Sequence, residues 1–390
     1  MRAHHRRGLA IGGCTLALLI ASGAHAVAGQ KKTTTKASAG KMFCAPEDVV
    51  VWKGGHRIPA VLLTSKGTLL VFAEQRHNSS DHGNVDLVLK RSSDNGKTWS
   101  KPMLIHDSGN RASGNPCPIQ DRETGTIWLL FARNNNKQAM VTHSKDDGRT
   151  WAKPLPLEKP TPVRNRHAKP VKKKDAWIAT GPCQGIQLAS GRLLAPANVH
   201  RSFSYYSDDH GKTWKHSNLI ANTSANECTA VELADGSVYM NLRLPGGRGN
   251  HHRASVVSKD GGKTWPLKAR HEPQLPGPAC HMGVVRFTDE KRHDRNRILF
   301  SGPAGPRKRA DLMIRISYDE CRTWQECRLV KRGRASYSNM VVLPDMSIGC
   351  VYETSDGGWQ SIRFARFTLE WLTKDKDKLD RSKFKPSGNK

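Results

Sequence analysis

The chain has 390 residues, and its 63 Lys and Arg residues outnumber its 34 Asp and Glu residues to give a formal net charge of +29. Its 34 glycines and scarcity of long apolar runs describe a turn-rich soluble chain and exclude a helical bundle or a membrane protein. A positive charge of this size attracts polyanions such as acidic glycans and nucleic acid, and it is compatible with an anionic substrate without proving one.

The first 26 residues have the pattern of a secretory signal peptide. A basic start precedes an apolar stretch at 9–20, and a small-x-small motif ends at Ala26. The apolar stretch is too short to span a bilayer, so we favour cleavage after Ala26 over a membrane anchor. Lipidation at Cys14 is a weaker alternative because this residue lies only a few positions into the apolar stretch. We therefore expect an exported protein, secreted or periplasmic, without stable membrane insertion.

Two low-complexity segments flank the central region. Residues 27–42 and 373–390 are rich in Lys, Thr and Ser and contain few large apolar side chains, so we predict a disordered linker and a basic disordered tail. Nothing within residues 43–372 has the composition of an interdomain linker. We predict a single domain over residues 43–372 and expect a monomer.

Within this domain, a turn followed by a short apolar strand recurs at intervals. The predicted strands are residues 68–74, 126–133, 192–198, 237–243 and 346–353. Each ends in a polar residue, in order Glu74, Arg133, Asn198, Arg243 and Glu353. In a radial array of sheets, equivalent strands point equivalent ends at one central region, so these side chains predict a shared site.

Five near-copies of the phrase Ser-x-Asp-x-Gly-x-Thr-Trp, which we call boxes, punctuate the same region. The boxes begin at Ser92, Ser144, Ser207, Ser258 and Ser317. Their aspartates lie 52, 63, 51 and 59 residues apart, which is the length of one supersecondary unit per repeat. The domain has room for about six such units, so we predict an all-β, six-bladed β-propeller of four-stranded antiparallel sheets, the sixth without a box.

The boxes themselves are interpreted as structural. Their Asp and Ser side chains suit turn amides, and their tryptophans suit packing between strands. The fifth box departs from the pattern, because Cys321 occupies the glycine position.

Other chemistry is not favoured by the sequence. The basic cluster at 164–174 has no interleaved aromatic residues, so it is interpreted as a solvated loop and not as a nucleic-acid site. Removing Cys14 with the signal peptide leaves eight cysteines, which we expect to be partly free and partly paired. Neither they nor the 17 histidines show a metal-binding spacing, so we predict no metal and no cofactor.

A set of polar residues outside the boxes remains to be explained. It comprises Arg57 in an Arg-Ile-Pro motif, Arg76, Asp81 eleven residues before the first box, Glu227, Arg243, Arg309, Tyr337 and Glu353. In their order and spacing, these residues and the boxes resemble the exo-sialidase (neuraminidase) family across essentially the whole predicted propeller.

The resemblance implies an exo-α-sialidase that acts on sialylated glycans, with an arginine triad of Arg57, Arg243 and Arg309. A sialoside carries a carboxylate on its anomeric carbon, and a guanidinium fork binds carboxylates better than a lysine ammonium does. In this family Glu353 would brace Arg57, and Arg76 would contact the sugar or its carboxylate.

The resemblance also implies the catalytic residues. A carboxylate nucleophile would approach a carbon that already bears a negative group, whereas a neutral tyrosine avoids this repulsion, and sialidases are the known tyrosine exception among glycosidases. Tyr337 would be the nucleophile, Glu227 its base, and Asp81 the general acid and later the base for water in a retaining mechanism. We prefer Asp81 to Asp86 because Asp86 begins a predicted strand.

Two positions depart from the family pattern and leave the sugar variant open. Asn115 stands where some bacterial members have aspartate, and Cys280-His281 lies where glutamine is common; both are expected near the acyl-amino or glycerol arm of the sugar, which makes Asn115 a candidate substrate-binding residue. Two alternatives remain, a catalytically silent sialic-acid-binding propeller and a hydrolase of a related ulosonic acid such as the deaminated sugar.

Overall fold

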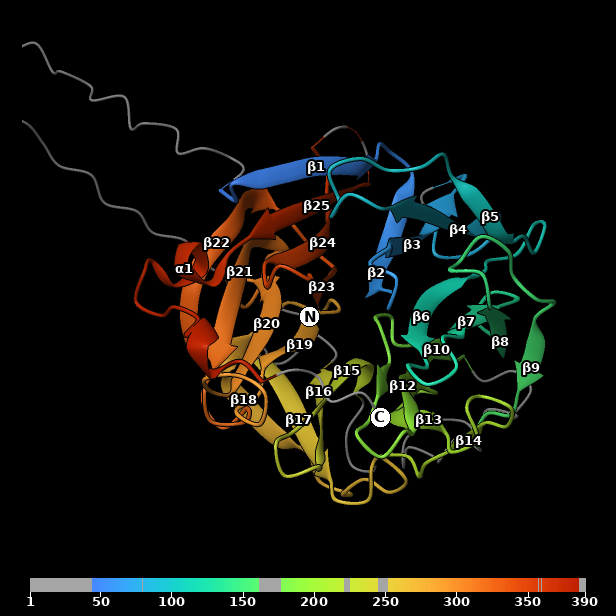
Figure 1. Ribbon diagram of the computed structural model, residues 1–390. Helices are drawn as coiled ribbons and strands as arrows, with labels where there is room; N and C mark the ends of the chain where they lie inside the picture. Colours follow the sequence, from blue (N-terminus) through green and yellow to red (C-terminus); the bar gives the residue numbers. More distant parts are fainter. Residues whose placement is uncertain are drawn as a thin grey trace, which may run out of the picture. The chain divides into compact units, whose positions relative to one another are not determined.

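The computed structural model describes residues 44–78, 80–160, 177–220, 225–244, 252–356, 358 and 360–385. The predicted signal peptide (1–26), linker (27–42) and the basic cluster at 164–174 lie outside these residues. Six antiparallel sheets, numbered here as blades 1 to 6 in chain order, surround a central axis (Figure 1).

Blades 1 to 3 hold the first half of the domain. Blade 1 contains β2 (His56–Leu63), β3 (Leu69–Arg76), β4 (Val85–Ser92) and β5 (Met103–His106). Blade 2 contains β6 (Gly114–Gln120), β7 (Ile127–Arg133), β8 (Gln138–Ser144) and β9 (Leu155–Leu157). Blade 3 contains β10 (Ala179–Thr180), β11 (Ile186–Gln187), β12 (Leu193–Asn198), β13 (Ser202–Ser207) and β14 (Lys215–His216).

Blades 4 to 6 complete the ring. Blade 4 contains β15 (Asn226–Glu232), β16 (Val238–Arg243), β17 (His252–Ser258) and β18 (Arg270–Pro276). Blade 5 contains β19 (Gly283–Thr288), β20 (Arg297–Pro303), β21 (Ala310–Ser317) and β22 (Gln325–Arg334). Blade 6 contains β23 (Ser338–Val342), β24 (Ile348–Thr354), β25 (Ser361–Phe367) and β1 (Glu47–Trp52).

The innermost strands contact one another in a closed circle. β2 contacts β6, β6 contacts β10, and β11 contacts β15. β15 then contacts β19, β19 contacts β23, and β23 contacts β2. The ring closes in blade 6, where β1 from the start of the domain pairs antiparallel with β25 from its end. The predicted six-bladed propeller is confirmed, with one refinement. Blade 3 has five strands because its innermost position is divided between β10 and β11, which both pair with β12.

Strand direction separates the boxes from the polar strand ends. In blade 1, Arg76 at the end of β3 pairs with Val85 at the start of β4, whereas Ser92, which opens the first box, pairs with Leu69 at the far end. The same order holds for β16 and β17 in blade 4, where the second strand ends at Arg243. The boxes therefore lie on one face of the ring, and the polar strand ends lie on the opposite face.

The boxes have the structural role predicted for them. In the first box, Gly96 N donates to Ser92 Oγ and Thr98 N donates to Asp94 Oδ1. The tryptophans pack across blade boundaries: Trp151 of blade 2 contacts Phe72 of blade 1 edge-on, with ring centroids 5.7 Å apart. In the fifth box, Cys321 keeps the glycine-like conformation with φ of 65°. Each box therefore closes a turn and joins its blade to the preceding one.

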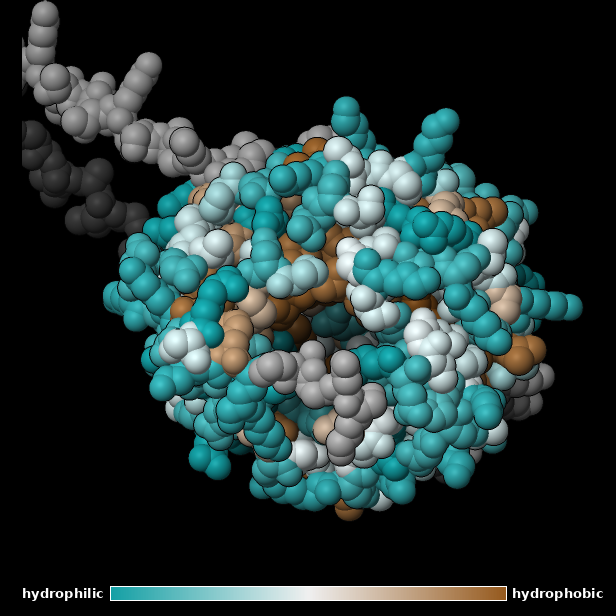
Figure 2. All heavy atoms as spheres, in the orientation of Figure 1, coloured by the Kyte–Doolittle hydropathy of each residue, from teal (hydrophilic) through white to brown (hydrophobic). Residues whose placement is uncertain are grey.

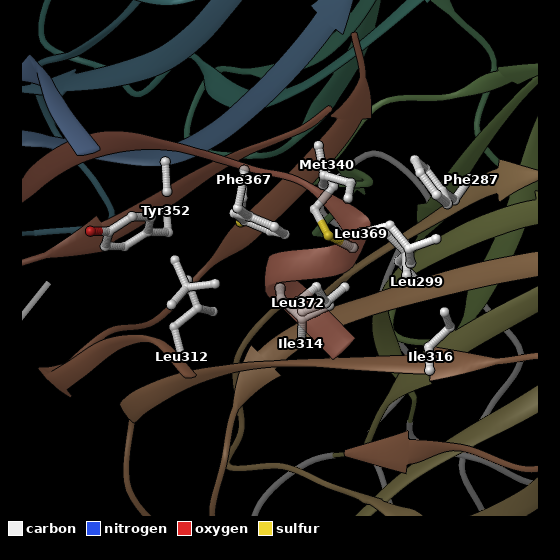
Figure 3. Packing of buried hydrophobic residues seen from close by; sticks show 14 of the residues in the cluster. Phe287, Leu299, Leu312, Ile314, Ile316, Met340, Tyr352, Phe367, Leu369 and Leu372 are labelled. Carbon is white, nitrogen blue, oxygen red and sulfur yellow. The ribbon is translucent and has the colours of Figure 1, made fainter. Parts of the chain in front are cut away.

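The segment after the last strand folds onto blades 5 and 6. The short helix α1 (Leu369–Thr373) begins at Thr368, whose side chain accepts from Trp371 N, and its buried Leu369 and Leu372 join an apolar cluster with Leu312 (Figure 3).

The predicted disordered tail is wrong for residues 373–385. Asp377 is buried and forms a 2.7 Å ion pair with the buried Arg297, and a 3₁₀ helix follows at Arg381–Lys383. The composition of this segment did not predict its order, because the order depends on the ion pair between Asp377 and the buried Arg297, which also pairs with Asp294. Residues 386–390 lie outside the described residues.

The expectation that some cysteines are paired is wrong for seven of the described cysteines. Free thiols are found at Cys117, Cys183, Cys228, Cys280, Cys321, Cys327 and Cys350. Among the described residues, no helix has the length and apolar character needed to cross a membrane. The surface in Figure 2 is largely hydrophilic around the rim and hollowed at the centre of the ring.

Candidate active site

Tyr337 lies immediately before β23, the innermost strand of blade 6, and its side chain is the centre of a polar cluster. The phenol donates a 2.6 Å hydrogen bond to Glu227 Oε1, which comes from β15 in blade 4. Arg243 Nη1, at the end of β16, lies 2.6 Å from Glu227 Oε2 and donates to the Tyr337 hydroxyl at 3.3 Å. Three side chains from two blades are thus joined through one hydroxyl.

The surroundings keep the phenol neutral. Burial and the negative charge of Glu227 raise the pKa of Tyr337 well above its usual value of 10, and the nearby guanidinium groups of Arg243 and Arg57 only partly oppose this. Because the hydroxyl hydrogen already points at Glu227, the proton has an acceptor when the oxygen attacks. The arrangement suits a neutral nucleophile with its own general base.

Arg57 lies on the other side of Tyr337 and is held by Glu353. The Arg57 Nε and Nη2 atoms donate to the two Glu353 oxygens at 3.2 Å each, and the same carboxylate accepts from Ile58 N at 2.7 Å. The Arg57 guanidinium carbon lies 5.1 Å from the centre of the Tyr337 ring. The bidentate geometry fixes the guanidinium plane, as the predicted bracing role of Glu353 requires.

Arg309 completes the triad from the loop before β21. Its guanidinium carbon lies 5.5 Å from the Tyr337 ring centre, and Nη2 donates to the Ala279 carbonyl at 2.5 Å. Unlike Arg57 and Arg243, it has no acidic partner among the described residues and is exposed. Arg309 is therefore the triad member whose charge remains unneutralised before a substrate arrives.

Asp81 reaches the site from the loop between β3 and β4. Its Oδ1 atom lies 2.5 Å from Arg76 Nη1 and 3.5 Å from Arg57 Nη1, while its side chain is 71% exposed. Burial would raise the pKa of Asp81, but the positive charges of Arg76 and Arg57 hold it below its usual value of 3.8. Asp86, the alternative acid, bonds instead to His77 Nε2 at 2.8 Å. The structure thus brings Asp81, and not Asp86, to the triad.

Glu74, one of the polar strand ends predicted to share a site, is a positioning residue to which the sequence analysis assigned no role. Its Oε2 atom accepts from Arg76 at 2.5 Å, and its Oε1 atom accepts from Asn115 N at 3.0 Å. Gly114 permits this contact, since a Cβ atom there would lie 2.0 Å from the carboxylate. Glu74 and Arg76 are two residues apart on one strand and therefore share a face, which was the available sequence signal.

Asn115 and His281 occupy the two positions that depart from the family pattern. Asn115 is buried with φ of 55°, and its carbonyl accepts from Thr180 Oγ1 at 2.6 Å. His281 is fully buried beside Tyr337, with ring centroids 6.1 Å apart, and neither ring nitrogen has a hydrogen-bond partner in the described structure. Burial, together with the charges of Arg253 and Arg243, holds the pKa of His281 well below 6.5. His281 is therefore a neutral ring against the nucleophile.

Two other predicted strand ends do not join this cluster. Arg133 Nε donates to Gln138 Oε1 at 2.8 Å, and the buried Asn198 amide has no side-chain partner in the described regions. Within those same regions, no group of three or more His, Cys, Asp or Glu side chains could hold a metal ion. The chemistry available in this cluster is that of arginines, carboxylates and one phenol.

Comparisons with known proteins agree with this arrangement. The family model of the BNR repeat-like domain matches residues 67–351. The sialidase of Micromonospora viridifaciens is 30% identical over 346 residues, covering 81% of this chain and 52% of that protein. Sialidase-2 of Mus musculus is 31% identical over 364 residues, covering 81% of this chain and 92% of that protein.

A solved structure shows the same fold. The Hadza microbial sialidase Hz136 superposes with a TM-score of 0.70 at 25% identity, covering 82% of this chain and 66% of that one. The chain thus spans about half the length of the Micromonospora relative and nearly all of the mouse one. On the family match over residues 67–351, the 31% identity over most of the mouse relative and the shared fold, this chain belongs to the sialidase family of BNR-repeat proteins.

Proposed function

We propose that the protein is an exported exo-α-sialidase that hydrolyses terminal sialic acids from glycoconjugates with retention of configuration. The observation that carries the proposal is the 2.6 Å hydrogen bond from Tyr337 to Glu227, surrounded by the three arginines. A clamp for a carboxylate beside a phenol with its own base matches the chemistry of an anomeric carbon that carries a carboxylate. Export is supported by the signal-peptide pattern alone.

In the first step, the triad binds the sugar carboxylate and the Tyr337 oxygen attacks the anomeric carbon. The phenol proton passes to Glu227 Oε1 as the bond to the sugar forms. The protonated form of Asp81, which is the minor form above its lowered pKa, gives its proton to the glycosidic oxygen, so that the bond to the aglycone breaks and a neutral alcohol leaves. The product is a sugar joined to Tyr337 and a deprotonated Asp81.

In the second step, water replaces the aglycone. Asp81 takes a proton from the water as the water oxygen attacks the anomeric carbon. The bond between the sugar and Tyr337 then breaks, and Glu227 returns the proton to the phenol oxygen. Two inversions at one carbon give net retention. All three residues end in their starting protonation states.

The direct test is release of free sugar by the purified protein from N-acetyl and deaminated sialosides in α2,3 and α2,6 linkage. We expect the N-acetyl donors to be hydrolysed, with the α anomer appearing first in the NMR spectrum. Binding without release from any donor would identify a silent glycan-binding propeller. Release from deaminated donors alone would identify a hydrolase of that related sugar.

Replacing Arg309 with Ala is expected to weaken binding of a sialic acid analogue by about 10- to 150-fold, because one charged hydrogen-bonding partner is worth roughly 1.5–3 kcal/mol. The Arg309 guanidinium has no acidic partner in the described structure, unlike Arg57 and Arg243. Removing it therefore leaves no carboxylate without a partner. Isothermal titration measures the dissociation constant. Arg322→Ala removes an exposed arginine from the box face and serves as the control. Equal dissociation constants for Arg309→Ala and the native protein would remove Arg309 from the clamp.

A further inference from the structure

Beside the candidate active site lies a strongly cationic surface, which we call the blade 5 rim. It consists of the exposed Arg307, Lys308, Arg309, Arg332 and Arg334. The first three lie in the loop between β20 and β21, and the last two close β22. The proposed reaction uses only Arg309, so four positive charges of the rim have no role in it.

The two segments of the rim are held together and lead directly to the nucleophile. Ala310 pairs with Arg334 across the β21–β22 ladder, and Ala335 N donates to the Arg309 carbonyl at 3.2 Å. Tyr337 lies two residues after Ala335, and its carbonyl accepts from Glu353 N at 2.9 Å. Backbone hydrogen bonds therefore fix the rim at the mouth of the site.

The charges of the rim are not matched by nearby acids. None of its five cationic side chains forms an ion pair with another described residue. Asp311 lies in β21, two residues after Arg309, and its Oδ1 atom accepts from Gly333 N at 2.7 Å. Neighbouring acids are already engaged, since Asp356 pairs with Lys331 and Glu326 pairs with Arg315. The rim thus presents a net positive field at the mouth of the site.

Within the site itself, the charges are closely balanced. Arg57 pairs with Glu353, Arg76 with Glu74, and Arg243 with Glu227. The paired arginines inside the site therefore contribute little to the long-range electric field. The rim arginines and lysine are the groups near the site that attract an anion from solution. A donor that carries one negative charge is held by the triad after docking. A donor with further negative charges gains additional attraction before docking.

We propose that the blade 5 rim selects sialoglycans whose remaining part carries a second anionic group, a carboxylate or a sulfate, next to the residue that is cleaved. This rests on the proposed sialidase function. Attraction between exposed charges acts over about 8 Å at physiological ionic strength, so the second group need not form a fixed contact with one arginine. The selection acts on capture of the donor, and its effect falls on kcat/KM and decreases with salt.

The test compares three donors that differ in charge beyond the cleaved residue: a neutral sialyllactose, an α2,8-linked disialyl glycan and a sialyl glycan with a sulfated galactose. The measured quantity is the ratio of kcat/KM for each anionic donor to that for the neutral donor. In the double variant Arg332→Gln/Arg334→Gln, we expect this ratio to be about 3- to 10-fold lower than in the native protein at low salt. Each exposed charge contributes a small, screened attraction. The ratio of the native protein should fall similarly when salt is raised.

A matched control separates the rim from the overall charge. Lys97→Gln/Arg322→Gln removes two exposed charges from the box face and lowers the net charge by the same amount. We expect this variant to keep the ratio of the native protein within about twofold, since its charges lie on the opposite face beyond screening distance. Melting temperatures establish that both variants are folded.

The outcomes separate this inference from the proposed function. A native protein that releases no sugar from any of the three donors contradicts the sialidase proposal itself. Hydrolysis of the neutral donor with no preference for the anionic donors overturns the inference alone, as does an equal fall in both double variants. A preference for only the disialyl or only the sulfated donor supports the inference and identifies which anion the rim selects.

Discussion

Tyr337→Phe is expected to lower turnover of natural sialosides by at least about a thousandfold while binding of a sialic acid analogue changes by less than about tenfold. The substitution removes one oxygen, the atom that bonds to Glu227 at 2.6 Å, and leaves the ring between Arg57 and Arg309. The carboxylate clamp is therefore kept and the nucleophile is lost. Parallel measurements of kcat and of analogue binding test this separation.

Tyr205→Phe is the matched control for this substitution. Tyr205 is a buried tyrosine of blade 3 whose hydroxyl has no hydrogen-bond partner in the described residues. Removing that hydroxyl should leave kcat within about twofold, because the residue lies outside the site. Near-native turnover in Tyr337→Phe would show that another group attacks the sugar. A parallel loss of binding and turnover would show that Tyr337 shapes the clamp.

Asp81→Asn is expected to have the second largest effect, a loss of about 10²- to 10⁴-fold in turnover of natural sialosides, since the leaving alcohol then lacks a proton donor. Donors with a nitrophenyl leaving group should lose less, because a phenolate leaves without protonation. Asp86→Asn is the control, as its carboxylate bonds to His77 away from the triad. A uniform loss on both kinds of donor would contradict the acid role of Asp81.

The pH profile follows from the same geometry. In the free protein, the charges of Arg76 and Arg57 overcome the effect of burial and hold the pKa of Asp81 below 3.8. Above its pKa, the fraction of Asp81 that carries a proton falls further with each unit of pH. We expect kcat/KM for natural sialosides to decrease from about pH 5 to about pH 8, and to decrease less for nitrophenyl donors. An increase over this range would contradict the assignment.

The sequence predicted the fold because its information is periodic. The boxes recur once in each of blades 1 to 5, and each supplies the same turn, as Ser92, Asp94 and Gly96 illustrate. Strand ends such as Arg243 and Glu353 could be placed near each other because equivalent strands of a propeller share a direction. The individual roles of Arg57, Glu227 and Tyr337 came from a family resemblance, since no local pattern identifies a pair 110 residues apart.

Other features depend on packing that a linear pattern does not encode. The bracing of Arg76 by Glu74 needs the missing side chain of Gly114, from the next blade. The order of the segment around Asp377 depends on Arg297, 80 positions earlier in the chain. The sequence marked His281 only as a departure from the family pattern, whereas its position against Tyr337, with both ring nitrogens buried and without partners in the described structure, depends on packing. In each case the decisive neighbour is distant in sequence.

Labelling with a 2,3-difluorinated sialic acid tests the central claim most directly. The fluorine at the anomeric carbon leaves readily, and the second fluorine slows hydrolysis of the resulting bond, so that the covalent intermediate accumulates. Mass spectrometry of the tryptic peptide that begins at Ala335 should place the added sugar on Tyr337, and Tyr337→Phe should take up none. A sugar located on a carboxylate such as Glu227, or a native protein that turns over sialosides without any covalent label, would contradict the account.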